Sequence, residues 1–283
     1  MHWKSIEGDA YWIAFAVSLV VIACWEMWQP WRKVSQQLVQ RWTNHGILLL
    51  GYSAISMLFF RGSSVATAVV FENSRLGLLN RPWLPYTVRF LAAVLLLDLT
   101  RYALHWACHS IPILWRVHQV HHSDHDYDLS TGLRAHPLER FLAFVTYLAV
   151  IAIVSPPPLA VLTNELLSLF QSFFSHANAS LPAWIERPLR KVFITPEMHR
   201  VHHSEEIPEQ NANLGDIFPW WDRILGTYVE SPAAGNDGLV IGLKGFQDAR
   251  SAQLLFMLKQ PFQSDPSPEI ARPASLTSAG AGD

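Results

Sequence analysis

Five long apolar runs limit what this chain of 283 residues can fold into. They cover residues 11–27, 47–60, 86–106, 141–154 and 159–174. A helix needs about 20 mostly apolar residues to cross a bilayer, and it satisfies its own backbone polar groups there. Only 16% of the residues are charged, against about 25% in an average soluble domain. We therefore predict an all-α integral membrane helical bundle with four or five spans.

The last two runs are separated by Ser155 and three consecutive prolines. Because proline ends a helix, residues 141–174 should form a helical hairpin. Each arm is shorter than a relaxed span, so the hairpin either crosses the bilayer or dips into it as a re-entrant element. The first run reads as a span rather than a secretory signal, because Glu7 and Asp9 precede it and no small-residue cleavage site follows.

Basic residues set the expected orientation. The loops 30–44 and 61–85 each carry three Arg or Lys, which leaves the positive-inside count tied. The basic residues of 110–140 and 182–230 break the tie in favour of the side that holds the first loop. We expect a cytoplasmic, His-rich helical cap formed by residues 107–140 and 177–283. The short loops and an Ala-rich tail, disordered from about residue 260, favour a bacterial inner membrane.

Eleven of the thirteen histidines lie between residues 105 and 203, in spaced groups. Pairs at i and i+4, and triads at i, i+3 and i+4, place imidazoles on one face of a helix. The candidate metal ligands are His105, His109, His118, His121, His122, His176, His199, His202 and His203. One tetrahedral zinc ion uses four ligands at most, so nine imidazoles suit two ions. Imidazole binds Fe, Zn, Cu and Ni, so ligand type alone leaves the metal open.

The sequence gives weaker evidence for a role of the remaining histidines, and of three polar residues, in the metal site. We expect no ligand role for His2, His45, His125 or His136. Asp98 precedes His105 by two helical turns and is expected to accept a hydrogen bond from an imidazole N–H, which would fix the tautomer. An ion pair with Arg101 or Arg89 explains Asp98 equally well. Further candidates for this supporting role are Asn178 and Asp222.

Several motifs in order resemble the fatty acid hydroxylase and sterol desaturase superfamily of membrane di-iron enzymes. They are HWACH at 105–109, HQVHH at 118–122, SHAN at 175–178 and HRVHH at 199–203, flanked by D-x-x-x-Y at 98–102, R-x-H-P-x-E at 134–139 and W-D-R-x-x-G-T at 221–227. Leu225 stands where the family has Phe, and His125 where it often has an acidic residue or proline. The resemblance covers about residues 95–230. It implies that the nine histidines bind two iron ions.

The resemblance implies O2-dependent oxidation of a lipid C–H bond, in a fatty acyl chain, a sterol or a related lipid. Hydroxylation is the first expectation and desaturation the other outcome. The expected organisation is N-terminal membrane spans at 1–94, a di-iron domain at 95–230 that includes the hairpin, and a C-terminal extension at 231–283. Residues 123–134, with Tyr127 and L-S-T-G-L-R at 129–134, also resemble the ether-lipid-cleaving alkylglycerol monooxygenase branch, which takes electrons from tetrahydrobiopterin.

The sequence has neither a basic field nor a dinucleotide-binding motif, and this limits its expected partners. A net charge of -2 gives no basic field for nucleic acid. No G-x-G-x-x-G follows a strand pattern, so we expect no nicotinamide or flavin domain. Electrons for lipid oxidation would therefore come from a separate reductase, ferredoxin or cytochrome.

Two other functions compete with oxidation. A zinc-dependent membrane hydrolase would use fewer ligands and a catalytic Glu within the motif, as in H-E-x-x-H. Neither triad has that Glu, although Glu205 and Glu206 follow the second one. A metal transporter would place its ligands near the bilayer midplane, whereas these histidines lie at the ends of the predicted spans.

Overall fold

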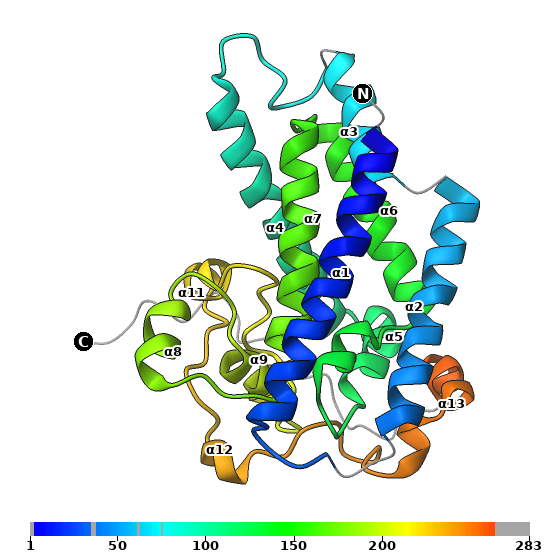
Figure 1. Cartoon of the computed structure of the whole chain (residues 1–283), viewed down its shortest axis with the longest axis vertical. Helices are drawn as coiled ribbons and strands as arrows, with labels where there is room; N and C mark the ends of the chain where they lie inside the picture. Colours follow the sequence, from blue (N-terminus) through cyan, green and yellow to red (C-terminus); the bar gives the residue numbers. More distant parts are fainter. Residues whose placement is uncertain (1–2, 35–37, 61–62, 75, 264–283) are drawn as a thin grey trace.

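The computed structural model describes residues 3–34, 38–60, 63–74 and 76–263. Within these ranges the chain forms helices and two isolated β-bridges, with no strand, so the predicted all-α fold is confirmed. The long helices form a bundle whose lower end carries a cap of short helices (Figure 1). The bundle helices are α1 (Trp3–Trp28), α2 (Leu38–Phe60), α4 (Tyr86–Ser110), α6 (Pro137–Val154) and α7 (Pro158–Ser175), with the shorter α3 (Ser64–Asn73) at the upper end.

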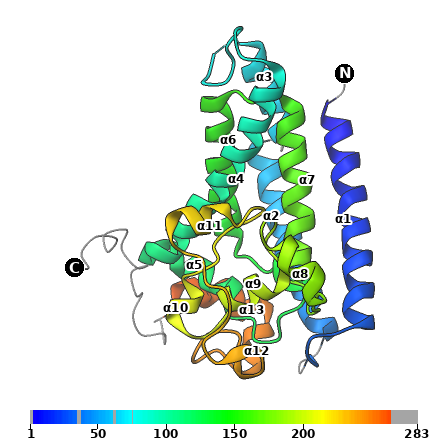
Figure 2. The ribbon, with the colours of Figure 1, turned by 90° about the vertical axis from the view of Figure 1, so that its left-hand side faces the viewer.

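The cap is built from short elements that follow α4 and α7 (Figure 2). Its first part is α5 (Pro112–His122) and the 3-10 helix η1 (Leu129–Leu133). Its second part is α8 (Ala183–Leu189), α9 (Pro196–His202), α10 (Ile207–Gln210), α11 (Trp220–Leu225), α12 (Gly235–Gly238), η2 (Ala249–Ala252), α13 (Leu254–Lys259) and η3 (Gln260–Phe262).

Two helical segments, 6–28 and 137–154, are long and apolar enough to cross a membrane by length and composition. The outer face of α1 exposes large apolar side chains, including Ile13 and Val20, at 65% and 59% of their surface. An apolar surface of this kind marks contact with lipid or a partner rather than with water. The helices α2, α4 and α7 do not meet the same measure, and a total of four or five spans stays a prediction.

The predicted hairpin is formed by α6 and α7, which break at the prolines. Ser155 caps α6 with φ +50, and Pro158 is the first residue of α7. The loop after α3 closes this end, because Leu78 and Leu79 donate backbone hydrogen bonds to the last carbonyls of α6. Gly77 has φ +99, and a Cβ there would lie 2.4 Å from the Cβ of Ser155, so this position requires glycine.

The C-terminal extension packs back onto the cap. Leu243 and Phe246 form a buried cluster with Trp115 of α5. Gln260 is buried and donates to the carbonyl of Gln119. The helix η3 thus begins where we expected disorder from about residue 260, and the rest of that expectation falls on residues 264–283, outside the described residues.

Candidate metal centre

Four segments bring the nine histidines together at the junction of bundle and cap. α4 carries His105 and His109 in its last turns, and α5 starts with Pro112 after a break at Ile111. Proline suits this first helical position because its missing N–H has no intrahelical partner there. His176 caps the C-terminus of α7. The side chain of Thr195 caps α9, which carries the second triad.

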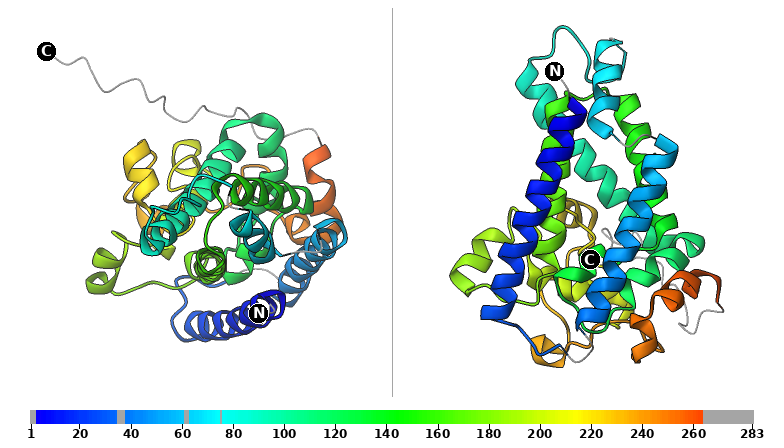
Figure 3. Two further views of the ribbon diagram at one scale, coloured as in Figure 1. Left: turned by 90° about the horizontal axis from the view of Figure 1, so that it is seen from above. Right: turned by 45° about the vertical axis from the view of Figure 1, so that its right-hand side comes forward.

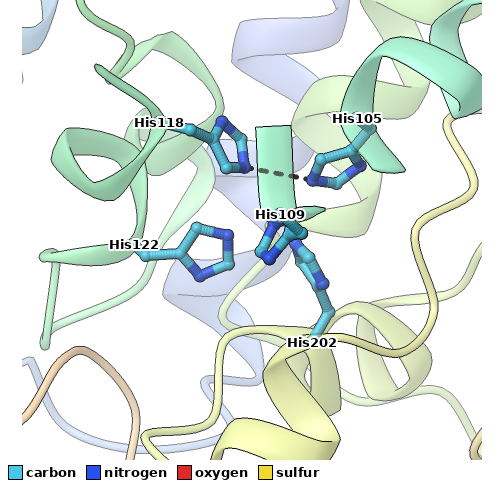
Figure 4. Close-up of side chains that lie close together, drawn as sticks. All are labelled: His105, His109, His118, His122 and His202. Atoms are coloured by element: carbon cyan, nitrogen blue, oxygen red, sulfur yellow. Dashed lines mark hydrogen bonds between the residues drawn. The ribbon is translucent and has the colours of Figure 1, made fainter. Parts of the chain in front are cut away.

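The histidines form two groups, and within each group one ring nitrogen from every residue lies within 4.8 Å of those of the others. The five-histidine group is His105, His109, His118, His122 and His202, whose rings converge from α4, α5 and α9 (Figure 4). The four-histidine group is His121, His176, His199 and His203. The groups are adjacent, since the rings of His122 and His203 stack with centroids 4.6 Å apart. The structure therefore brings all nine predicted residues into one double cluster.

Each histidine triad is divided between the two groups. In α5, His118 and His122 belong to the five-histidine group, while His121 belongs to the other. A helix turns about 100° per residue, so positions i and i+4 align more closely than positions i+3 and i+4. The second triad is divided the other way: His199 and His203 belong to the four-histidine group, and His202 belongs to the five-histidine group. The two triads thus bridge the groups.

Hydrogen bonds on the outer side of the rings fix the tautomers. Four Nδ1 atoms lie 2.8, 3.0, 2.7 and 2.9 Å from backbone carbonyl oxygens, in the pairs His105–Leu214, His121–Arg134, His176–Ser172 and His202–Ala212. A carbonyl only accepts, so each of these Nδ1 atoms donates and the Nε2 lone pair is left free to bind an ion. This is the arrangement that metal-binding histidines usually show.

Two further Nδ1 atoms face side-chain acceptors. Nδ1 of His118 lies 2.9 Å from Oε1 of Glu139, in the first turn of α6. Nδ1 of His109 lies 3.2 Å from Oδ1 of Asn211. A carboxylate behind an imidazole orients the ring and makes its other nitrogen a stronger donor to a metal.

Within the part of the chain that the structure describes, several buried ring nitrogens have no hydrogen-bond partner, which is what a metal site requires of its ligand atoms. The Nε2 atoms of His109 and His202, and both ring nitrogens of His122 and His203, are buried with no hydrogen-bond partner among the described residues. Buried polar atoms in proteins are almost always paired, so these orphaned nitrogens point to ligands of an ion. His105 Nε2 and His118 Nε2 are 3.1 Å apart, about the spacing of two nitrogens that bind one ion at right angles.

Burial keeps these imidazoles neutral. It lowers the pKa of His202 to about 3 and holds the pKa of His122 and His203 well below the usual value, with neighbouring imidazoles adding to the effect. A metal binds the neutral form of imidazole, so this environment favours binding at neutral pH. All nine residues of the two groups are histidines, so the donor set is nitrogen-rich and carries no charge of its own.

Asp98 does not hold an imidazole, contrary to the prediction, and it does not form the alternative ion pair. Its oxygens accept from the backbone N of Ile217 at 3.0 Å and from Nε1 of Trp221 at 2.7 Å. Arg101 instead lies 3.7 Å from Asp216, and Arg89 pairs with Glu72. Asp98 thus joins α4 to α11 and to the loop before it.

Asn178 and Asp222 likewise contact backbone groups and not the histidine rings. Asn178 exchanges hydrogen bonds with the backbone of Arg32 and so ties the end of α7 to the end of α1. The oxygens of Asp222 accept from the backbone N of Leu214 and of Gly215. Asp222 therefore supports His105 indirectly, by holding the loop that contains its carbonyl acceptor.

Sequence reasoning missed a buried ionic network that joins α2 to the segment between α5 and η1. Arg41 of α2 pairs with Asp124 and Asp128 at 2.8 and 2.7 Å, and all three side chains are almost fully buried. His45, which we considered incidental, lies 2.9 Å from Ser130 within this network. Glu139 and Asn211 were missed as well. The R-x-H-P-x-E motif contains Glu139 and was the available signal, whereas nothing local marks Asn211.

Comparisons with known proteins identify a matching family and several relatives. The model of the fatty acid hydroxylase family matches residues 90–227. Alkylglycerol monooxygenase from Homo sapiens is 33% identical over 68% of the chain and 40% of its own length. The ornithine lipid hydroxylase OlsE from Rhizobium tropici is 25% identical over 91% of the chain and 77% of its own length. Methylsterol monooxygenase 1 from Rattus norvegicus is 27% identical over 52% of the chain and 49% of its own length.

The chain spans about two fifths of the length of the alkylglycerol monooxygenases it matches. No solved structure matches it. The matched segment 90–227 contains all nine clustered histidines and Glu139. Through this segment, the chain belongs to the fatty acid hydroxylase family.

Proposed function

We propose that this protein is a membrane-bound di-iron monooxygenase that hydroxylates a C–H bond of a lipid. The observation that carries the proposal is the pair of adjacent all-histidine groups, in which four rings donate Nδ1–H to backbone carbonyls and so keep the Nε2 lone pair free. The names of the relatives, which are monooxygenases and hydroxylases, support this class of reaction.

The residues of the two groups would hold the irons, and the residues behind them would orient the rings. Reduced iron in a nitrogen-rich site supplies the O2 activation that an unactivated C–H bond requires. The reaction balances as one C–H bond and O2 giving one C–OH group and water, with two electrons and two protons from outside. Desaturation would use the same site, with loss of a second hydrogen from the substrate.

The substrate class follows from the location of the site. The histidines belong to α4, α5, the end of α7 and α9, which meet where the cap joins a bundle with two helices apolar enough to cross a membrane, and we infer that an acyl chain would enter there from the lipid. We propose that the cap faces the cytoplasm of a bacterial inner membrane and receives electrons from a separate reductase, ferredoxin or cytochrome. We also propose the organisation 1–94, 95–230 and 231–283, with the di-iron domain in the middle segment.

Ether-lipid cleavage is a second candidate, favoured by the match to alkylglycerol monooxygenases over 68% of the chain. Hydroxylation of the carbon beside an ether oxygen gives a hemiacetal, which breaks into an aldehyde and an alcohol. The same residues would serve this reaction, so the choice depends on the substrate.

Lipid profiling of cells with and without the protein tests the proposal. A lipid heavier by one oxygen atom supports hydroxylation, loss of two hydrogens indicates desaturation, and a fatty aldehyde indicates ether cleavage. A protein that holds one stable zinc ion and consumes no O2 after reduction would instead support the membrane hydrolase. Metal flux across vesicles without lipid oxidation would support the transporter.

A further inference from the structure

Arg134 connects the four-histidine group to the rest of the fold. Its backbone carbonyl accepts from Nδ1 of His121 at 3.0 Å, and Nε2 of His121 lies 3.2 Å from Nε2 of His176. The carbonyl therefore lies behind a ring whose other nitrogen is beside a second ring of the same group. An acceptor in this place fixes the tautomer and the orientation of a metal-binding imidazole. The position of the Arg134 backbone thus sets the direction of the His121 lone pair.

The side chain of Arg134 is completely buried and holds this part of the backbone in place. Its guanidinium donates to the carbonyl of Val120, to Oγ of Ser123 and to the carbonyl of Ser251, each at 2.7 Å. Val120 lies in the last turn of α5, where backbone carbonyls have no partner within the helix. Arg134 therefore caps the helix that carries the first histidine triad, in addition to contacting one of its rings.

The helix α2 holds Arg134 from the membrane bundle. The N-terminal end of α2 reaches the cap and packs against η1, η2 and α13 (Figure 3, right). Nε2 of His45 lies 3.3 Å from Nη1 of Arg134, and its Nδ1 lies 2.9 Å from Oγ of Ser130. An arginine only donates, so Nε2 of His45 accepts and its Nδ1 donates to Ser130. Ser130 donates at 2.6 Å to Asp128, the partner of Arg41. Continuous hydrogen bonds thus join α2 to Arg134.

The buried charges of this network balance one another. Arg41 and Arg134 supply two cations, and Asp124 and Asp128 supply two anions, all of them at most 2% exposed. A buried ion pair contributes little net stability, and its best-attested use is to fix one arrangement of the groups around it. The network is therefore suited to hold the backbone of η1 and of Arg134 in one position.

We propose that Arg134 is a positioning residue for the four-histidine group, and that α2 supports the metal centre through His45 and Arg41. The R-x-H-P-x-E motif would then support one group from each of its ends, since Glu139 holds a ring of the five-histidine group. The helix α2 lies outside residues 90–227, which the family model matches. The inference rests on the proposed function and assigns a separate support to each of its two ions.

The test uses the full chain purified in a neutral detergent, freed of metal and titrated with Co²⁺ against a competing chelator, with binding read from the visible absorption of the bound ion. Arg134→Lys keeps the charge but loses the planar fork, so it should weaken one ion about tenfold or more. Glu139→Gln should weaken the other ion, and the double variant should weaken both. Wild-type affinity for both ions in Arg134→Lys, equal weakening of both, or a double variant that keeps one ion at wild-type affinity would overturn the proposal.

A milder variant tests the contribution of α2 and does not require Arg134→Lys to fold. His45→Leu removes the acceptor for Arg134 and should weaken the same ion. His45→Gln can place an amide oxygen near the position of Nε2 and should restore the affinity. The matched control Ser53→Ala removes a hydrogen bond within α2, to the carbonyl of Leu49, and should bind like the wild type. Wild-type affinity in His45→Leu would overturn the role of α2.

Failure of the proposed function would give a different result. A wild type that binds only one Co²⁺ ion would contradict the di-iron proposal, whatever the variants show. In that case, equal binding of this ion by Arg134→Lys, His45→Leu and the wild type would overturn the positioning role of Arg134, and weaker binding by both variants would support it.

Discussion

Nδ1 of His118 lies 2.9 Å from Oε1 of Glu139, so a carboxylate at the start of α6 holds a ring of the five-histidine group. His118 has its other nitrogen 3.1 Å from Nε2 of His105. One imidazole therefore connects the hairpin to the last turns of α4. This contact makes Glu139 a positioning residue for the metal centre.

Glu139→Gln should lower metal affinity about 10–100-fold, because the imidazole of His118 loses the carboxylate that orients it and strengthens it as a donor. Metal content after dialysis against a graded chelator measures this directly. Asp237→Asn in the exposed helix α12 removes the same charge and should keep full metal content. Unchanged retention in Glu139→Gln would show that the contact with His118 is not needed for binding.

His121→Ala should abolish lipid oxidation while leaving the protein in the membrane, because His121 belongs to the four-histidine group and α5 lies in the cap. His125→Ala is the matched control, since His125 lies outside both groups and its Nδ1 is 3.2 Å from Ser251 Oγ. The two variants are compared by product formation per chain in isolated membranes. Full activity of His121→Ala would refute its role as a ligand.

Acidification should destabilise the metal-free protein. Burial lowers the pKa of His202 to about 3, so the folded state binds fewer protons than the unfolded state between about pH 3 and 6.5. The stability contributed by the neutral ring is present above the unfolded pKa and is lost as the pH falls toward the folded pKa. Each such histidine adds about 1.4 kcal/mol per pH unit within that window. His122 and His203 shift in the same direction.

Thermal unfolding of the chelator-treated protein at pH 7.5 and 5.5 measures this effect, and the Tm should be lower at pH 5.5. His125→Ala, which leaves the buried rings intact, should show the same dependence. A Tm that rises on acidification would mean that the rings are charged in the folded protein.

Gly77→Ala should destabilise the upper end of the bundle by about 1–3 kcal/mol, because φ is +99 and the new Cβ would meet Ser155 of the hairpin turn. Gly46→Ala is the control, since a Cβ there meets nothing within 4 Å and alanine favours the helix α2. Thermal unfolding in detergent should give a lower Tm for Gly77→Ala and an equal or higher Tm for Gly46→Ala. Equal Tm values for Gly77→Ala and wild type would contradict the requirement for glycine.

The hairpin and the members of the histidine cluster could be predicted because both depend on local rules. Three prolines end α6 whatever it packs against, and the spacing of His118, His121 and His122 is a property of one helix. The division of each triad between two groups depends on how α5 and α9 are rotated toward each other. That rotation is set by packing across the cap, which spacing does not encode.

The partners of the polar residues were harder to predict because they are distant in the sequence. Asp98 lies one turn from Arg101 along α4, yet its acceptors are used by Ile217 and Trp221 from the loop before α11 and from α11. Arg41 of α2 likewise pairs with Asp124 and Asp128, which lie between α5 and η1 in the cap. Helical spacing could therefore suggest that Asp98 contacts His105, but it could not show that other donors use the carboxylate instead.

The metal stoichiometry of the purified full-length protein tests the central claim most directly. Elemental analysis of protein produced with iron, together with Mössbauer spectroscopy, should give two iron ions per chain in neighbouring nitrogen-rich sites. His122→Ala and His203→Ala should each reduce this number, because one stacked ring belongs to each group. A single ion per chain, or zinc that iron does not replace, would contradict the di-iron account.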